Sequence, residues 1–258
     1  MAVEFRRMTT EAKSSHQIQI KTGLVAYFDI LGYKNLLLAN SVEDSIKIID
    51  TAMLQALDEI EGGYKSITDK RPFDLETFVI SDSILVALST GGQSNEGKGR
   101  GTLFFAVFCA ELMTHLFQKG LPTRGAIASG DFIARSKNNR VTLAGQPIVD
   151  AHELASSLEL AGCAIVPSSE AEALFGSARE FAQLYQTPIK NSPACELHLL
   201  RYCFRNFDEE NSISRKKIIE CFEAHKKGLN PNSLGKLNNT IHFLKKCNQL
   251  PSNEVKTV

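Results

Sequence analysis

The sequence predicts an α+β fold organised around a single sheet. Three observations support this class: an apolar run rich in β-forming residues at 24–28, a long helical repeat of apolar residues after it, and two short apolar stretches separated by three polar residues. With 258 residues and 43% hydrophobic composition, the chain can bury one substantial core. We therefore expect one domain with a smaller extension.

The first strand and the first helix are defined by their apolar patterns. Residues 24–28 are apolar throughout, which is typical of a strand buried on both faces, and Asp29 stands at its end. Apolar residues then recur at helical spacing between positions 42 and 60. Ser41 is the expected N-cap of this helix, and Gly62-Gly63 is its expected stop.

A hairpin and a second helix should follow. The apolar stretches at 78–80 and 84–87 predict two strands, and the polar tip between them presents Asp82. Residues 91–101 are rich in Gly, Ser and Asn, so we expect a surface loop there. The apolar segment 103–117 predicts a buried helix.

A strand with many small residues is expected at 123–130, directly after Pro122. Its composition indicates that another group approaches the backbone closely. The remaining expected elements are a turn at Asn138-Asn139, a strand at 141–143, a helix at 147–160 and a strand at 163–166. The order contains the ferredoxin-like βαββαβ arrangement, in which the end of the first strand faces the hairpin tip.

We expect three parts along the chain: a polar N-terminal leader at 1–22, a main domain at 23–185 and a C-terminal extension at 186–258. The extension changes character, because it combines one apolar strand-like piece with two Lys-rich helical patterns. These three pieces are residues 197–204, 214–227 and 233–246.

Charge and composition exclude several classes of partner. Lys+Arg and Asp+Glu both total 29, so no net field attracts the chain to nucleic acid or to an anionic membrane. No apolar run approaches the roughly 20 residues of a membrane span, and the leader lacks the apolar region of a signal peptide, so a cytoplasmic protein is expected. The six cysteines are scattered and do not cluster with histidines, which favours reduced structural thiols over a zinc site.

The predicted arrangement brings Asp29 and Asp82 together. Two converging carboxylates are the ligands expected for two Mg²⁺ or Mn²⁺ ions that are shared with the oxygens of a triphosphate. The stretch 30–35 contains a glycine and several free backbone N–H groups leading into a helix, which suits phosphate. Such a site could lower the pKa of a ribose 3′-hydroxyl and release pyrophosphate without a protein nucleophile.

Three short motifs resemble those of the class III nucleotidyl cyclases, and they occur in the order of that family between about residues 24 and 166. Residues 28–33, Phe-Asp-Ile-Leu-Gly-Tyr, resemble the opening F-x-D-I-x-G-F motif. Residues 80–83, Ile-Ser-Asp-Ser, resemble the I-G-D hairpin that carries the second metal-binding Asp. Residues 124–130, Arg-Gly-Ala-Ile-Ala-Ser-Gly, resemble the R-x-G-I-x-x-G strand.

The resemblance implies a head-to-tail homodimer that converts a nucleoside triphosphate to a 3′,5′-cyclic monophosphate and pyrophosphate. Catalysis would depend on Asp29, Asp82 and Arg124, and two Mn²⁺ or Mg²⁺ ions would be held by both carboxylates and the Ile30 carbonyl. The residues implied in nucleotide binding are Phe28, Leu31, Gly32, Tyr33, Lys34, Asn35 and Phe78.

Two departures from the family pattern bear on the substrate. Phe78 stands where purine cyclases carry a base-recognising Lys, and residues 145–154 lack the Asn and Arg of the G-x-x-V-N-x-A-x-R pattern. Two alternatives explain these losses. The chain could be a catalytically dead nucleotide-binding regulatory module, or it could be a divergent enzyme in which Arg124 or Lys34 faces the phosphates. The retained carboxylates favour the enzyme.

An intact metal pair with altered base-recognition positions resembles the bacterial pyrimidine cyclases of Pycsar antiphage defence, which make cUMP or cCMP. This resemblance favours UTP as substrate and a separate effector protein that reads the product. Cytidylate and adenylate cyclase activity stay open as alternatives. A diguanylate-cyclase-like polymerase would require a G-G-D-E-F-type hairpin, which residues 81–83 do not supply.

Each candidate also has a purely structural interpretation. Asp29 could cap a strand end, and Asp82 could be an ordinary turn residue. Phe78 could belong to the core, and Arg124 could form a surface ion pair. His152 and its acidic neighbour are expected on a solvated helical face and are not nominated.

Overall fold

The computed structural model describes residues 5–7, 19–67, 73–137, 140–168, 175, 180–204, 213–225 and 231–250. Its nine-stranded sheet has the order β1-β3-β4-β2-β5-β7-β9-β8, with β6 paired to β5 outside this path. The strands are β1 (Phe5–Arg7), β2 (Lys21–Ile30), β3 (Asp74–Ile80), β4 (Ser83–Ser89), β5 (Thr123–Lys137), β6 (Arg140–Ala144), β7 (Gly162–Ile165), β8 (Ala182–Thr187) and β9 (Cys195–Leu200).

The helices in the described part of the chain lie between these strands and after the last of them. They are α1 (Tyr33–Ala39), α2 (Val42–Ile49), the π-helical turn η1 (Asp50–Leu54), α3 (Gln55–Ile67), α4 (Asn95–Gln118), α5 (Gln146–Ser157), α7 (Arg215–Glu223) and α8 (Pro231–Lys246). The expected βαββαβ order is confirmed, because β3-β4-β2-β5 form neighbouring antiparallel strands with helical connections between β2 and β3 and between β4 and β5.

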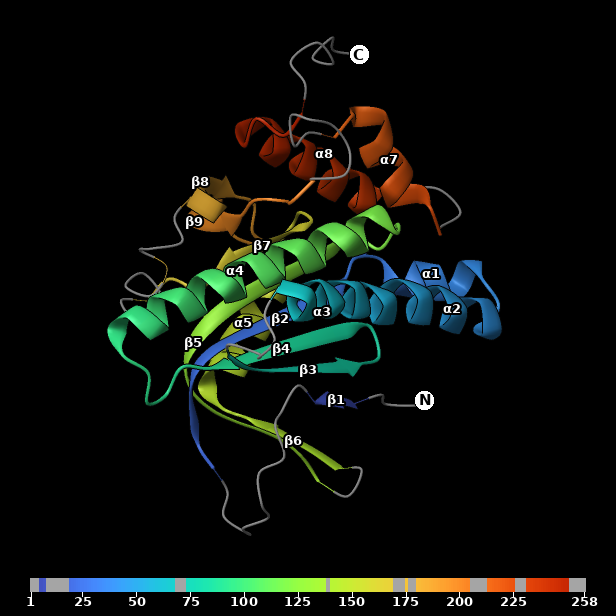
Figure 1. The fold of residues 1–258 in the computed structure, drawn as a ribbon. Helices are drawn as coiled ribbons and strands as arrows, with labels where there is room; N and C mark the ends of the chain where they lie inside the picture. The colour runs from blue at the N-terminus through green and yellow to red at the C-terminus, as the bar shows by residue number, and fades with distance from the viewer. Residues whose placement is uncertain are drawn as a thin grey trace.

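The two faces of the sheet are covered by different elements (Figure 1). On one face, Leu24, Ala26 and Phe28 of β2 pack into the main core with buried residues of α3 and α4. On the other face, Tyr27 and the small residues of β5 pack against α5. Alternate side chains of β2 therefore belong to different layers, as the period of a strand requires. Asp29 lies on the same face as Tyr27.

The first helical segment is longer than the sequence predicts. Ser41 is the N-cap, since its hydroxyl accepts a hydrogen bond from the backbone N–H of Asp44 at 3.1 Å. The expected stop at Gly62-Gly63 is wrong, because α3 continues to Ile67. A glycine in a helix costs only about 1 kcal/mol, and the buried Leu57 and Ile60 hold this helix on the core.

Helix α4 also begins earlier than predicted. The hydroxyl of Ser94 accepts from the backbone N–H of Gly97 at 3.2 Å and caps the helix, so residues 95–101 are helical and not loop. Gly101 is buried beside Phe73 and Leu88, where the absence of a side chain lets the helix lie close to the sheet. By length and composition α4 could cross a membrane, but 67% of its apolar window is buried in the fold, as in a core helix.

The close approach expected along β5 is found at Gly125. A Cβ atom there would lie 2.5 Å from Cδ1 of Phe28, so the aromatic ring of β2 occupies the space above this glycine. β5 runs on to Lys137 and pairs with β6; the turn expected at Asn138-Asn139 lies outside the described residues. α5 ends at Ser157, before the expected residue 160, because Leu158 is extended and bridges to Ile189.

The C-terminal segment continues the main sheet and core. β9 pairs antiparallel with β7, and β8 pairs with β9. Figure 1 shows α7 and α8 stacked over the end of α4, and Phe222 of α7 lies 5.9 Å from Phe117 of α4 between ring centroids. The two Lys-rich helices were predicted, whereas β1 and β8 were not, because their short, polar sequences lack a strand pattern.

Candidate active site

Asp29 and Asp82 meet at one edge of the antiparallel sheet. Asp29 is at the end of β2 and pairs across the strands with Ser83 of β4 and Arg124 of β5. Asp82 lies in the hairpin tip, where the neighbouring Ser81 adopts a left-handed φ of 59°. The backbone N–H of Ile30 donates to the Asp82 carbonyl at 3.1 Å, which fixes the tip against β2. The charge of Asp82 and its hydrogen bonding both raise the pKa of Asp29, so the two acidic residues are placed near one another at this sheet edge.

Arg124 forms a fork on Asp29. Its Nε and Nη2 lie 2.9 Å and 2.8 Å from Oδ2 of Asp29, and its Nη1 donates to the Ser156 carbonyl of α5 at 2.7 Å. The side chains of Asp29 and Arg124 are only 16% and 21% exposed. Arg124 therefore orients the Asp29 carboxylate and ties it to the end of α5. A charge-assisted pair with a planar guanidinium is specific in geometry as well as strong.

The charge at the carboxylate pair is incompletely balanced. Burial raises the pKa of Asp29, the hydrogen bond and the charge of Arg124 lower it, and the nearby Asp82 raises it again, so that the pKa stays above its ordinary value. Loss of water and a like charge both disfavour the ionised form of a carboxyl group. The pair therefore gains from additional positive charge.

Tyr27 and Ser83 lie beside the pair and were missed from the sequence. Tyr27 Oη and Ser83 Oγ are 2.7 Å apart. Burial is the main reason that the pKa of Tyr27 is raised; its hydrogen bond with Ser83 opposes the shift, while the charges of Asp29 and Asp82 add to it. Strand alternation could have revealed Tyr27, because residues two positions apart on a strand, such as Tyr27 and Asp29, lie on the same face.

His152 lies against this cluster although the sequence did not favour it. Its ring meets that of Tyr27 edge-on, with centroids 4.9 Å apart. The residue is exposed on α5, as expected for a solvated helical face. Its position near Tyr27 comes from the packing of α5 on β2 and could not be read from local sequence.

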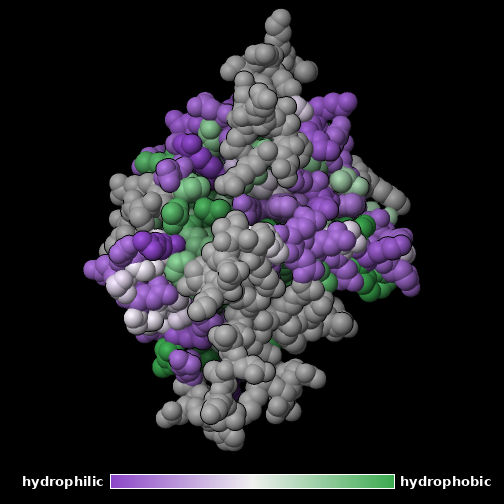
Figure 2. All heavy atoms as spheres, viewed as in Figure 1, coloured by the Kyte–Doolittle hydropathy of each residue, from purple (hydrophilic) through white to green (hydrophobic). Residues whose placement is uncertain are grey.

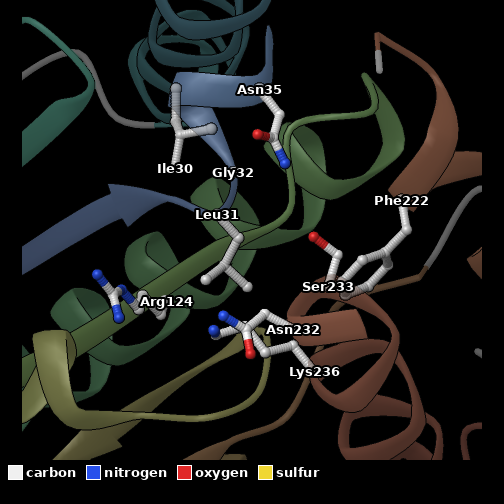
Figure 3. A pocket seen from close by; sticks show the side chains of 9 residues that line it. All are labelled: Ile30, Leu31, Gly32, Asn35, Arg124, Phe222, Asn232, Ser233 and Lys236. Atoms are coloured by element: carbon white, nitrogen blue, oxygen red, sulfur yellow. The ribbon is translucent and has the colours of Figure 1, made fainter. Parts of the chain in front are cut away.

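A pocket of about 170 Å³ adjoins Arg124 (Figure 3). The stretch expected to bind phosphate supplies one wall, where Gly32 precedes α1 with a left-handed φ of 75°. Helices α7 and α8 supply the opposite wall, which the sequence did not indicate. The lining residues are Ile30, Leu31, Gly32, Asn35, Arg124, Phe222, Asn232, Ser233 and Lys236.

Other predicted nucleotide-binding residues are placed differently. Phe28 is 1% exposed in the main core, on the face away from Asp29, so the structure does not bring it to the site. Phe78 shares the face of Asp29 but is 3% exposed and packs with Leu85 and Phe132. Tyr33 is half-buried against the core. Lys34 is exposed and does not line the pocket.

The donor set suits a hard cation that keeps outside ligands. Among the residues that the structure describes, no cluster of three or more His, Cys, Asp or Glu side chains could enclose a metal ion. Two carboxylates with a backbone carbonyl are instead the kind of partial set that Mg²⁺ or Mn²⁺ completes with water and phosphate oxygens. The side chains present therefore fit a metal that arrives with a phosphorylated substrate.

Comparisons with known proteins identify the fold. No family model and no curated protein sequence matches the chain. The structure of the adenylyl cyclase CyaB from P. aeruginosa matches with a TM-score of 0.52 and 16% identity, over 74% of this chain and 98% of that one. The chain therefore has the fold of a class III cyclase catalytic domain.

Two further structures were also found. The guanylate cyclase domain of RhGC from Catenaria anguillulae, in complex with GTP, gives a TM-score of 0.49 at 14% identity, over 71% of this chain and 98% of that one. The guanylyl cyclase Cya2 gives a TM-score of 0.48 at 12% identity, over 70% of this chain and 91% of that one. About a quarter of the present chain lies outside the match to CyaB.

Proposed function

We propose that the protein is a cytoplasmic nucleotide cyclase that converts a nucleoside triphosphate to the 3′,5′-cyclic monophosphate and pyrophosphate. The observation that carries this proposal is the meeting of Asp29 and Asp82 at one sheet edge of a cyclase fold. Their incompletely balanced charge and the adjoining pocket support it.

Asp29, Asp82 and the Ile30 carbonyl would hold two Mg²⁺ or Mn²⁺ ions. Bound there, such ions lower the pKa of the ribose 3′-hydroxyl and neutralise phosphate charge. The 3′-hydroxyl would give its proton to solvent water, and its oxygen would bond to the α-phosphorus while the bond from this phosphorus to the bridging oxygen breaks and pyrophosphate leaves. Arg124 keeps the Asp29 carboxylate in one orientation through its fork of hydrogen bonds. Residues 31–35 would contact the phosphates.

UTP is the substrate that we propose. Phe78 stands at the position where purine cyclases carry Lys, and its buried apolar ring cannot donate a hydrogen bond to a purine acceptor. The combination of motifs resembles the pyrimidine cyclases of Pycsar antiphage defence. We therefore propose a bacterial antiviral signal, cUMP, that a separate effector reads, with cytidylate or adenylate cyclase as the alternative activity.

A homodimer is part of the proposal. Class III sites form between two catalytic domains, and this chain has the residues of only one such domain. α5 carries neither the Asn nor the Arg of the family pattern, so a different cation must face the phosphates. Arg124 is the candidate closest to the carboxylate pair, since Lys34 does not line the pocket.

A non-catalytic nucleotide-binding module is the second candidate. The fork from Arg124 to Asp29 engages the carboxylate that a metal would use, and this observation favours it. Such a module would bind a triphosphate tightly and leave it unchanged.

Incubation with each of the four nucleoside triphosphates and Mn²⁺, followed by mass spectrometry, tests the proposed function. We expect a cyclic monophosphate, with UTP turned over fastest. Asp29→Asn and Asp82→Asn should each abolish cyclisation, whereas Glu196→Gln, at an exposed carboxylate of β9 outside the pair, should not. Absence of cyclic product from all four substrates would overturn the proposal, and tight binding without turnover would select the non-catalytic module.

A further inference from the structure

The pocket beside Arg124 is closed by residues far away in the sequence. Phe222 of α7 and Asn232, Ser233 and Lys236 of α8 form what we call the C-terminal wall (Figure 3). Opposite this wall lies the stretch from Ile30 to Asn35. The proposed phosphate-binding stretch therefore faces a helix pair of the same chain.

The C-terminal wall is held in a fixed position. The Asn239 side chain donates to the Glu159 carbonyl at 2.7 Å, and the backbone N–H of Ala161 donates to the Thr240 hydroxyl at 2.9 Å. Both contacts join α8 to the segment just before β7. The buried Leu237, on the same helix, belongs to the main core. A side chain at position 236 is consequently carried by an anchored element.

The lining of the pocket suits an anion. It contains two amides, a hydroxyl and two cationic side chains, Arg124 and Lys236, whose carboxylate partners Asp29 and Glu159 are not among the nine lining residues. Lys236 is a compact charge on a flexible stem, whereas Arg124 presents a planar fork. A volume of about 170 Å³ is smaller than a typical pocket for a whole drug-sized ligand and suits a pair of phosphoryl groups.

In the structure, the ammonium group of Lys236 is paired with the carboxylate of Glu159. Its Nζ lies 3.3 Å from Oε2 of Glu159, and its side chain is 17% exposed. A distance of 3.3 Å between these atoms is longer than a strong charge-assisted hydrogen bond. Because Lys236 also lines the pocket, Glu159 and a bound phosphate oxygen would compete for the same ammonium group.

We propose that the C-terminal wall supplies a phosphate contact from the same chain, with Lys236 as the cation and Glu159 as its competitor. The ligand is the diphosphate end of the nucleoside triphosphate, or the pyrophosphate that leaves. This inference rests on the proposed function for its ligand, but the contact can be measured without turnover.

Calorimetric titration of inorganic pyrophosphate into the metal-free full chain tests the proposal. Lys236→Met should weaken pyrophosphate binding about tenfold, as expected for loss of a charged hydrogen bond. Glu159→Gln should strengthen it, because the competitor is neutralised while the backbone carbonyl that accepts from Asn239 is retained. Lys246→Met, at an exposed lysine of the same helix, should leave the affinity unchanged.

The inference would be overturned if Lys236→Met bound pyrophosphate with wild-type affinity, or if Lys246→Met lost as much pyrophosphate affinity as Lys236→Met. Glu159→Gln keeps the test decisive even if the Lys236 variant folds poorly, since a gain in affinity cannot come from misfolding. If no triphosphate is cyclised but both variants shift pyrophosphate binding as expected, the proposed function fails and this inference stands. If Lys236→Met cyclises the substrate with an unchanged KM, the proposed function stands and this inference fails.

Discussion

At the scale of single residues, the ion pair between Arg124 and Asp29 organises the candidate site. Two nitrogens of the guanidinium contact one carboxylate oxygen, and the third contacts the Ser156 carbonyl on α5. The arginine thus joins β2, β5 and α5 at one point. A lysine could carry the same charge but could not make these three contacts together.

Arg124→Lys should therefore lower kcat for cyclisation by about 10- to 100-fold, which corresponds to the loss of one or two charged hydrogen bonds. The melting temperature should fall only slightly, because the positive charge beside Asp29 is kept. Rates of cyclic nucleotide formation at saturating substrate and Mn²⁺ measure the effect. A lysine variant with wild-type kcat would show that the fork has no role in the reaction.

The positions of Asp29 and Asp82 could be predicted from the sequence, because each residue lies in a short motif. Asp29 and Asp82 stand at a strand end and a hairpin tip, so local pattern and topology together bring them close. Lys236 could not be found in this way, because nothing in its own segment indicates that α8 faces residue 124. The prediction for Phe28 is wrong because it follows the motif alone, whereas strand alternation puts Phe28 on the face opposite Asp29.

At the scale of elements, the far end of β2 is tied to β3 by a partly buried ion pair. Lys21 Nζ lies 2.7 Å from Glu76 Oε2 and 3.1 Å from Asp74 Oδ2, and the side chains of Lys21 and Glu76 are 12% and 3% exposed. Burial lowers the pKa of Lys21, but the hydrogen bonds and charges of Glu76 and Asp74 outweigh it, so the pKa is raised.

Lys21→Met should destabilise the protein by about 3 kcal/mol at neutral pH, because a buried carboxylate loses its partner. Since the raised pKa favours the charged lysine in the folded state, the stabilisation is present below the ordinary lysine pKa and is lost as the pH rises through the raised value. Urea denaturation across the alkaline range measures both effects. The difference between wild type and variant should shrink at high pH; a constant difference would contradict the ion-pair account.

Element boundaries were the weaker part of the prediction, and each error has a physical cause. Glycines at 62–63 and 97–101 indicated a stop and a loop, yet α3 and α4 run through them. Packing of the buried faces outweighs the small cost of each glycine. Strand β8 was not predicted because its sequence, Ala-Gln-Leu-Tyr-Gln-Thr, lacks a clear strand pattern. In the structure this segment pairs with β9.

At the scale of the whole molecule, the main core extends from β2 to α8. Buried residues of β2, α4, α7 and α8 belong to one hydrophobic cluster, including Phe28, Phe117, Phe222 and Phe243. The sequence predicted the two Lys-rich helices but not that they would close the pocket beside Arg124. That arrangement depends on contacts across more than a hundred residues, which periodicity does not encode.

Some apolar side chains are exposed on the surface of the protein. Figure 2 shows hydrophobic side chains among hydrophilic ones on the side where α1 and α2 lie. Leu38, Val42 and Ile46 of this region are 75%, 72% and 53% exposed. Because single apolar side chains are common on protein surfaces, these residues do not by themselves indicate a partner.

Binding of Mn²⁺, followed by electron paramagnetic resonance in the presence of 3′-deoxy nucleoside triphosphates that cannot cyclise, tests the central claim most directly. The claim is that Asp29 and Asp82 together hold the metal ions. Wild type and Glu196→Gln should bind two Mn²⁺ per chain, and Asp29→Asn and Asp82→Asn should each weaken binding at least tenfold. Equal Mn²⁺ binding by all four proteins would contradict the claim.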